Sequence, residues 1–187
     1  MKIESRTLPK KSVSFLSIFF FIILSFLVEA RAKPHEIKIP LGLAWGDGVE
    51  KLEAMARPGG FSITQRQEIS NKIILTVHGL LGTALQESLF FFQNNALIEI
   101  EYRYGDSSWK GPGYQEFFDA FRRMYDTKYG SGTQLIHMSS TRQKDLVISL
   151  TGYQWSDPSS ILDLYYYSAA LGEEHSYRLV SLHYKAP

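Results

Sequence analysis

The sequence predicts an α+β fold in which helices cover one face of an antiparallel sheet. Three observations support this prediction: two stretches with apolar residues at helical spacing, several stretches in which apolar and polar residues alternate, and a series of apolar positions that returns 75 residues later. The expected unit is one helix followed by a four-stranded meander, duplicated over residues 37–104 and 112–186. Because short turns join consecutive strands, the strands pair antiparallel, and one sheet face can stay open to solvent.

Two helices are expected. The first has Asp47 as its N-cap, with Glu50 reaching back to the cap amide, and Pro58 and the glycines after it end the helix. The second follows Pro112 and ends at Gly130, where a left-handed cap is expected. Its apolar residues repeat every three or four positions and form one stripe: Tyr114, Phe117, Phe118, Phe121, Met124 and Tyr125. Each helix is expected to pack on the same sheet face.

In the predicted strands the apolar residues repeat every second position, which sends neighbouring side chains to opposite faces. Asn94 and Asn95 both tolerate positive φ, so they indicate a two-residue hairpin turn that pairs Phe92 with Leu97 and Phe91 with Ile98. The residues expected to face the helices are Phe61, Ile63, Ile73, Leu75, Val77, Leu89, Phe91, Ile98, Ile100, Tyr102, Ile136, Met138, Ile148, Leu150, Leu164, Tyr166, Val180, Leu182 and Tyr184.

The internal repeat is inferred from two segments that match at a constant offset of 75 residues without a gap. The segment 89–92 corresponds to 164–167, and Ile73 and Leu75 correspond to Ile148 and Leu150. Chance alternation of apolar residues in two unrelated meanders is the alternative explanation.

Residues 1–32 have the composition of a secretory signal peptide. A basic segment is followed by an apolar run from Val13 to Val28 and by the small residues Ala30 and Ala32 of a cleavage site. The run has 16 residues, whereas a helix needs about 20 to cross a bilayer. We expect cleavage after Ala32, no stable membrane anchor afterwards, and one domain over 33–187 in the periplasm or outside the cell. An uncleaved N-terminal anchor is the alternative.

Composition argues against several classes of function. Residues 33–187 hold 15 Lys/Arg and 17 Asp/Glu, and this balance speaks against nucleic acid as a partner. The chain has no cysteine, which excludes disulfides, thiolate zinc sites and a cysteine nucleophile. His78, His137 and His183 are free to share one sheet face with carboxylates, but solvated strand histidines are the simpler interpretation, so no metal and no cofactor is expected.

The candidate site is the sheet face opposite the helices. The residues that alternate with those expected to face the helices would present bulky rings on this face. Contiguous exposed apolar patches of this kind mark interaction sites. This candidate binding face consists of Phe90, Phe92, Leu97, Tyr165, Tyr167, Leu179 and His183, bordered by Glu99, Glu101, Arg103, Ser181 and Lys185. The alternative is that residues 35–46, long loops or a second subunit cover this face and make the rings structural.

The order of elements also resembles known secreted proteins. Residues 39–42 (Ile-Pro-Leu-Gly), Trp45 with Gly46, a short helix and an aromatic strand ending in Asn94 and Asn95 are similar to small secreted bacterial proteins of unassigned role. The tandem arrangement resembles the β-lactamase inhibitor proteins, and each half resembles the small domains of outer-membrane assembly lipoproteins. This resemblance implies protein binding, in the inhibitors through the open sheet face, and carries over no functional residue. The chain departs from both groups by lacking cysteines.

Together these observations predict an exported, noncatalytic module that binds an extracytoplasmic protein, or a small apolar molecule, through the open sheet face. The alternative is an extracytoplasmic hydrolase whose serine or histidine groups meet only in space. The oligomeric state is left open.

Overall fold

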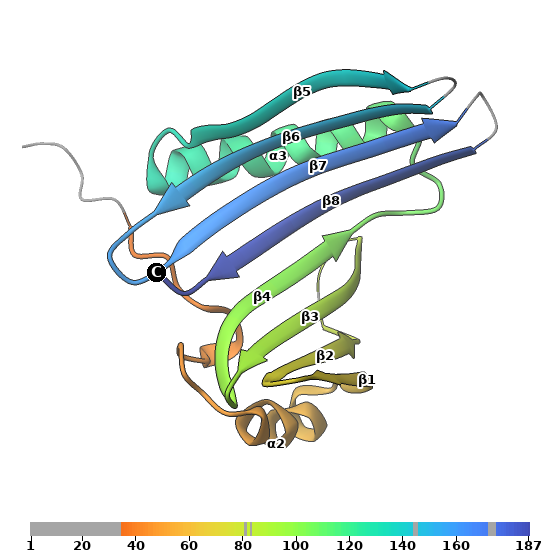
Figure 1. The fold of residues 1–187 in the computed structure, drawn as a ribbon. Helices are drawn as coiled ribbons and strands as arrows, with labels where there is room; N and C mark the ends of the chain where they lie inside the picture. The colour runs from red at the N-terminus through yellow and green to blue at the C-terminus, as the bar shows by residue number, and fades with distance from the viewer. Residues whose placement is uncertain (1–34, 81, 83, 144–145, 172–174) are drawn as a thin grey trace, which may run out of the picture. The chain divides into compact units, whose positions relative to one another are not determined.

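The computed structural model describes residues 35–80, 82, 84–143, 146–171 and 175–187 (Figure 1). The predicted signal peptide, residues 1–32, lies outside the described residues. Within the described ranges, no helix combines the length and the apolar character needed to cross a membrane.

The chain is a mixed α+β protein, as predicted. A short 3-10 helix precedes a helix and four strands, and a longer helix precedes four more strands. In chain order the elements are η1 (Pro40–Gly42), α2 (Val49–Gly59), β1 (Ser62–Ile69), β2 (Lys72–His78), β3 (Leu85–Gln93), β4 (Ala96–Tyr104), α3 (Gly111–Tyr129), β5 (Thr133–Gln143), β6 (Leu146–Ser156), β7 (Ile161–Leu171) and β8 (His175–Lys185).

The eight strands form one sheet in the order β1-β2-β3-β4-β8-β7-β6-β5. Every neighbouring pair is antiparallel, which confirms the predicted strand direction. Two meanders therefore meet at β4 and β8, with a register that runs from Glu99 opposite Lys185 to Tyr104 opposite Val180. This junction brings residues about 80 positions apart in the sequence onto neighbouring strands.

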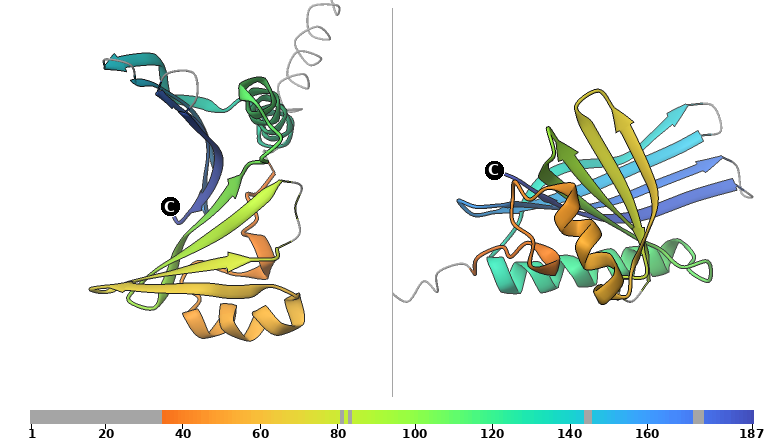
Figure 2. Two further views of the ribbon diagram at one scale, coloured as in Figure 1. Left: turned by 90° about the vertical axis from the view of Figure 1, so that its right-hand side faces the viewer. Right: turned by 90° about the horizontal axis from the view of Figure 1, so that it is seen from below.

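The two helices lie on the same side of the sheet (Figure 2, left). Helix α3 packs against β6, β7 and β8, and α2 packs against β1. We call this side the inner face and the opposite side the outer face. Strands β5 to β8 bow toward α3, so their outer face, on the side away from this helix, is concave (Figure 2, left).

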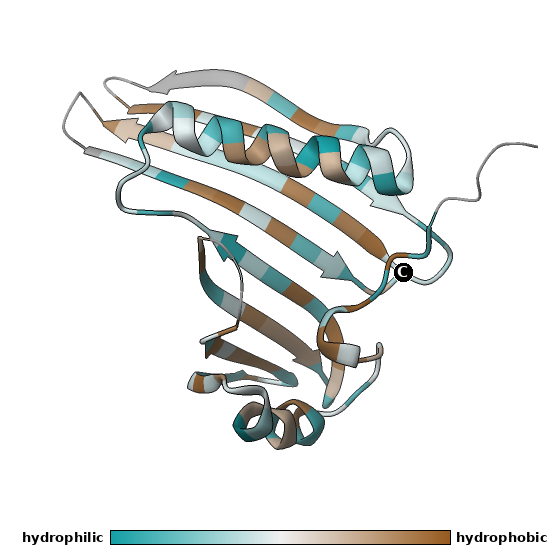
Figure 3. Ribbon diagram, turned by 180° about the vertical axis from the view of Figure 1, so that it is seen from behind, coloured by the Kyte–Doolittle hydropathy of each residue, from teal (hydrophilic) through white to brown (hydrophobic). Residues whose placement is uncertain are grey.

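The hydrophobic core lies on the inner face. Leu52 of α2, Phe118 of α3 and Leu164 of β7 are each at most 2% exposed. Ile37 and Leu43 belong to the same core cluster, and the segment that carries them runs on the helix side of the sheet (Figure 3). Residues 35–46 therefore add to the inner layer instead of covering the outer face.

The hairpin turn between β3 and β4 also caps α2. Asn94 and Asn95 have φ angles of 51° and 62°, which confirms the predicted turn. Asn95 Oδ1 accepts a hydrogen bond from the Val49 amide at 3.1 Å, so it satisfies one of the free amides at the start of the helix. The predicted N-cap Asp47 is wrong: Gly48 occupies that position and has no side chain for the role.

Candidate functional site

Three of the seven residues predicted for the binding face do not lie on the outer face. Phe90, Phe92 and Leu97 are 0%, 1% and 1% exposed and belong to the core. On the neighbouring strands, Phe90 lies opposite Leu75 and Ile100, which are also fully buried. The predicted exposure of these three side chains is therefore wrong.

A β-bulge on β4 explains this error. Phe91 pairs with Glu99 and not with Ile98, so Ile98 is the extra residue of the bulge. As a result, Ile100 shares a face with Phe92 instead of Phe91. Because side chains alternate strictly along a strand, a shift of one residue exchanges the two faces.

The other four predicted residues do lie on the outer face. Tyr165 pairs with Ser181, and Tyr167 pairs with Leu179. His183 follows on β8 at the next position of the same parity. All four are partly exposed. Among the residues that alternate with them, Leu164, Val180 and Leu182 are almost fully buried on the inner face, and Tyr166 is partly buried against the core.

An apolar patch extends from these residues across β6 to β5. Leu150 lies directly opposite Tyr167 on one side and Met138 on the other. Met138 is 38% and Tyr177 57% exposed, and the rings of Tyr167 and Tyr177 lie 5.9 Å apart. We name the following residues the outer apolar patch: Met138, Ile148, Leu150, Tyr167, Tyr177 and Leu179.

Ile136, Met138, Ile148 and Leu150 were expected to face the helices, and this expectation is wrong. On β6 the odd-numbered residues face the helices. This is shown by Tyr153, whose ring centroid lies 6.2 Å from that of Phe118 on α3. Tyr153 and the buried Trp155 interrupt the apolar series of β6 with aromatic residues of the opposite parity, a signal that the repeat argument overlooked.

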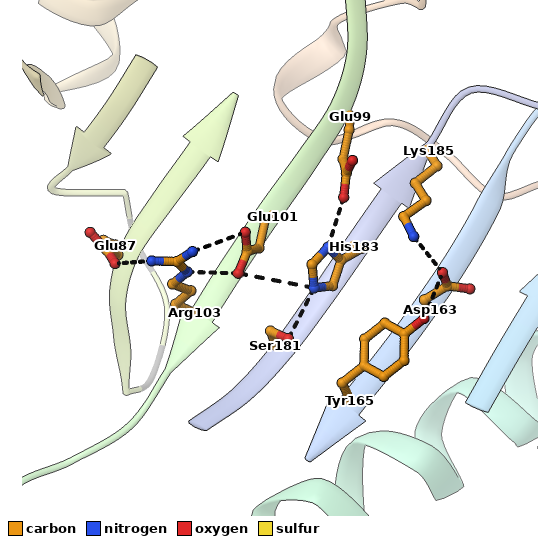
Figure 4. A network of polar contacts seen from close by, with 9 residues as sticks. All are labelled: Glu87, Glu99, Glu101, Arg103, Asp163, Tyr165, Ser181, His183 and Lys185. Atoms are coloured by element: carbon orange, nitrogen blue, oxygen red, sulfur yellow. Dashed lines mark hydrogen bonds and ion pairs between the residues drawn. The ribbon is translucent and has the colours of Figure 1, made fainter. Parts of the chain in front are cut away.

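The polar residues of the outer face form a network across β3, β4, β8 and β7 (Figure 4). The guanidinium of Arg103 contacts Glu87 at 2.8 Å and Glu101 at 2.6 Å. Glu101 is only 7% exposed, and a buried carboxylate needs such a partner. Burial opposes the charge of Arg103, but the hydrogen bonds to Glu101 and Glu87 outweigh it and raise the pKa of the guanidinium.

His183 links β8 to the carboxylates of β4. Its Nδ1 lies 2.8 Å from Glu99 Oε1 and its Nε2 lies 3.0 Å from Ser181 Oγ. Glu101 approaches Nε2 at 4.0 Å, and the Tyr165 ring stands edge-on to the imidazole with 5.4 Å between centroids. Hydroxyl, imidazole and carboxylate thus follow one another in the order of a serine–histidine–acid triad.

Asp163, which the sequence analysis missed, anchors the far end of the network. It is 2% exposed and accepts hydrogen bonds from Lys185 Nζ at 2.8 Å, Gln154 Nε2 at 2.8 Å and Tyr165 Oη at 3.3 Å. Burial opposes the charge of Lys185, but the contact with Asp163 raises its pKa. Since Asp163 stands two residues before Tyr165 and four before Tyr167, the same alternation was sufficient to place it on this face.

The network has an excess of negative charge. It contains two permanent cations and four carboxylates: Arg103 and Lys185 against Glu87, Glu99, Glu101 and Asp163. An acidic border beside an apolar patch is complementary to a surface with basic side chains around an apolar centre.

The histidines considered as metal ligands do not meet. His137 pairs with Thr151 on the inner face and lies 3.3 Å from its hydroxyl, whereas His183 lies on the outer face. In the part of the chain that the structure describes, no three His, Cys, Asp or Glu side chains are arranged to hold a metal ion.

Comparison with models of protein families, with curated proteins and with solved structures gave no match. The interpretation of the outer face therefore comes from its own geometry.

Proposed function

We propose that this protein is an exported, noncatalytic module that binds another extracytoplasmic protein through its outer face. The outer apolar patch carries this proposal, because Tyr177 is 57% and Met138 38% exposed on a concave surface. Exposed apolar patches with a polar border are typical of protein interaction sites. Export through cleavage after Ala32 is part of the proposal.

The chemistry of the face favours a partner with an apolar centre and a basic border. Tyr167 and Tyr177 would act as the anchors, since tyrosine contributes strongly to interface energies. The acidic network would steer Lys and Arg side chains of the partner during association. We also propose a resemblance to the β-lactamase inhibitor proteins, and binding through an open sheet face agrees with it.

Site-specific photo-crosslinking in the native envelope tests this proposal. A photoreactive amino acid replaces Tyr177 on the outer face or, as the matched control, Met124 on α3, which is 48% exposed. We expect a discrete adduct from position 177 that is absent from position 124. Equal adducts from both positions, or none from position 177, would contradict the proposed face.

Affinity measurements with the captured partner test its chemistry. Tyr167→Ala combined with Tyr177→Ala should weaken binding by about tenfold or more, as at other aromatic interface anchors. Added salt should slow association, because the steering is electrostatic. An affinity that is unchanged in the double variant would exclude the patch as the contact surface.

A second candidate function is supported by the contacts of Ser181, His183 and Glu99. Ser181 Oγ would be the nucleophile of a hydrolase, His183 the general base and Glu99 the group that orients the imidazole. The weakness of this candidate is the oxyanion site. Ser181 pairs with β4 on one side and β7 on the other, so its backbone amide belongs to the sheet, and the nearby Arg103 side chain is bound to carboxylates.

A fluorophosphonate probe distinguishes the two candidates, since it labels activated serines. Covalent labelling at Ser181 that disappears in Ser181→Ala and in His183→Gln would favour the hydrolase. The binding module predicts no labelling at this residue.

We also propose that the two halves, 37–104 and 112–186, arose by duplication. The order of elements and the meeting of the two meanders at β4 and β8 support this. An offset of 75 residues does not align β3 with β7 correctly, because it matches the buried Phe90 with Tyr165, which lies on the outer face. A superposition that pairs Phe90 with Leu164 and keeps both helices in common is the test.

A further inference from the structure

A cavity of about 520 Å³ opens on the inner face. Its walls come from separate parts of the first half: Leu41 of η1, Met55 of α2, Leu85 of β3, and Tyr102 and Tyr104 of β4. The cavity therefore lies on the side of the sheet opposite the proposed protein-binding face.

The arrangement of the helices explains why this space is not filled. Helix α2 packs against β1 and helix α3 packs against β6, β7 and β8, so β3 and β4 lie between the two helices. From α3, the rings of Phe117 and Phe121 pack against Tyr104, at 5.3 and 5.1 Å between centroids. Between the two helices, Leu85 and Tyr102 are therefore only partly buried, although Phe90 beside them is fully buried.

The chemistry of the lining is apolar and uncharged. Among the described residues, no Asp, Glu, Lys, Arg or His side chain lines the cavity, and the polar side-chain groups of this lining are the phenols of Tyr102 and Tyr104. Burial raises the pKa of both phenols, so both keep their protons and remain hydrogen-bond donors at neutral pH. A charged ligand would lose its hydration here without gaining an ionic partner.

A buried hydroxyl lies on the strand next to Tyr102, which lines the cavity. Ser88 is directly opposite Tyr102 on the neighbouring strand and shares its face. It is 0% exposed, and its Oγ has no hydrogen-bond partner in the described part of the chain. Such groups are rare in folded proteins, because each leaves a desolvated polar atom unsatisfied.

We propose that this cavity binds one uncharged, mainly apolar small molecule that carries a single hydrogen-bonding group. Its volume lies within the range of about 300–1,000 Å³ that is usual for ligand pockets. The apolar body of the ligand occupies the space between Met55 and Leu85, and its polar group accepts a hydrogen bond from a tyrosine of β4. This site does not depend on the proposed function of the outer face.

NMR titration with 1-octanol and octanoate tests the proposal, since the two probes share a chain length and differ in charge. We expect octanol to shift the methyl signals of Leu41, Met55 and Leu85 in a saturable way, and octanoate to bind at least about tenfold more weakly. Equal or tighter binding of octanoate, or octanol shifts that map elsewhere or never appear, would overturn the proposal.

Two variants test the site residue by residue. Met55→Trp fills the cavity from a partly exposed position of α2 and should abolish the octanol shifts while circular dichroism stays unchanged. Tyr102→Phe removes one donor and should weaken octanol binding about 3- to 10-fold, the usual effect of one hydrogen bond. Tyr167→Phe is the matched control on the outer face and should bind octanol as the wild type does. Octanol binding that both cavity variants retain unchanged would exclude this cavity.

Discussion

Two segments of similar sequence turn opposite faces to the helices. In β3 the residues 89–92 place Phe90 and Phe92 in the core, whereas in β7 the residues 164–167 place Tyr165 and Tyr167 on the outer face. Both segments are unbroken runs of leucine and aromatic residues. Such a run has no alternation of its own, so the neighbouring strands decide which side chains are buried.

The neighbouring strands differ in a way that explains this result. Strand β4 carries Glu99, Glu101 and Arg103 at alternate positions, and these polar residues must share a face with their partners Phe91 and Leu89 on β3. Burying three charged residues would cost far more than leaving two apolar ones at the border of the outer face. Charged residues on one strand therefore predict the faces of an adjacent apolar strand better than the apolar strand does itself.

Phe92→Ala gives the largest expected effect and tests the first half of this comparison. Phe92 is 1% exposed, and truncation of a buried phenylalanine lowers the free energy of unfolding by about 3–5 kcal/mol. Urea denaturation of the wild type and the variant measures this difference. A loss below about 1 kcal/mol would show that this ring is not part of the core.

Alkaline pH separates the inner tyrosines from the exposed ones. Burial, together with Tyr184 and Tyr104, raises the pKa of Tyr102 well above its ordinary value of 10. Below pH 10 both states keep this proton. Above pH 10 the unfolded chain releases it and the folded protein does not, so stability falls as the pH rises, by up to about 1.4 kcal/mol per pH unit for each such group.

The Tyr102→Phe variant should therefore lose stability less steeply between pH 10 and pH 12. Denaturant titrations at pH 9, 10, 11 and 12 measure the slope. Tyr177→Phe, which alters a residue that is 57% exposed, is the control for loss of a hydroxyl. Parallel curves for Tyr102→Phe and the wild type would contradict the burial of Tyr102.

Asp157→Ala tests the link that holds the N-terminal segment on the inner face. The Asp157 carboxylate accepts hydrogen bonds from the amide of Ile37 at 2.5 Å and from the amides of Ser159 and Ser160 at 2.7 and 2.8 Å. Its removal should cost about 1–2 kcal/mol, measured by urea denaturation. Asp157→Asn keeps one acceptor oxygen and should lose less; an equal loss in both variants would argue that charge, not hydrogen bonding, matters.

Tyr167→Ala gives the smallest expected effect and tests the second half of the comparison. Tyr167 is partly exposed on the outer face, so its truncation should change the free energy of unfolding by less than about 1 kcal/mol. Measured beside Phe92→Ala under the same conditions, it isolates the difference between the two faces. A loss as large as that of Phe92→Ala would mean that the outer face is covered.

The positions of the elements were predictable from local signals. Helical spacing indicated α3, and the end of this helix at Gly130 was also expected. The left-handed cap expected there is wrong, because Gly130 combines a φ of 88° with a ψ of 173°. The Asn94-Asn95 turn has the positive φ angles that its two residues favour. The polar border of the candidate face was predictable as well, because Glu99, Glu101 and their partners on β8 alternate with buried residues.

The faces of β6 were marked locally by Tyr153 and Trp155, whereas the faces of β3 and the cap of α2 were not predictable from such signals. The bulge at Ile98 depends on how β4 pairs with β3, and nothing in the local sequence marks it. The side-chain acceptor at the start of α2 is Asn95 Oδ1, about 45 residues further along the chain. The bulge depends on pairing between two strands, and the cap joins residues that are distant in the sequence, so the pattern within one element contains neither.

The α+β class, the antiparallel meanders, the Asn94-Asn95 turn and the polar side chains that border the outer face follow from the amino-acid sequence alone. These features follow from periodicity, from backbone preferences and from the cost of burying charge, which act over a few residues. Which aromatic rings entered the core and which remained on the outer face depends on how the strands pair in three dimensions. That choice depends on strand register, and one extra residue at Ile98 is enough to exchange the two faces.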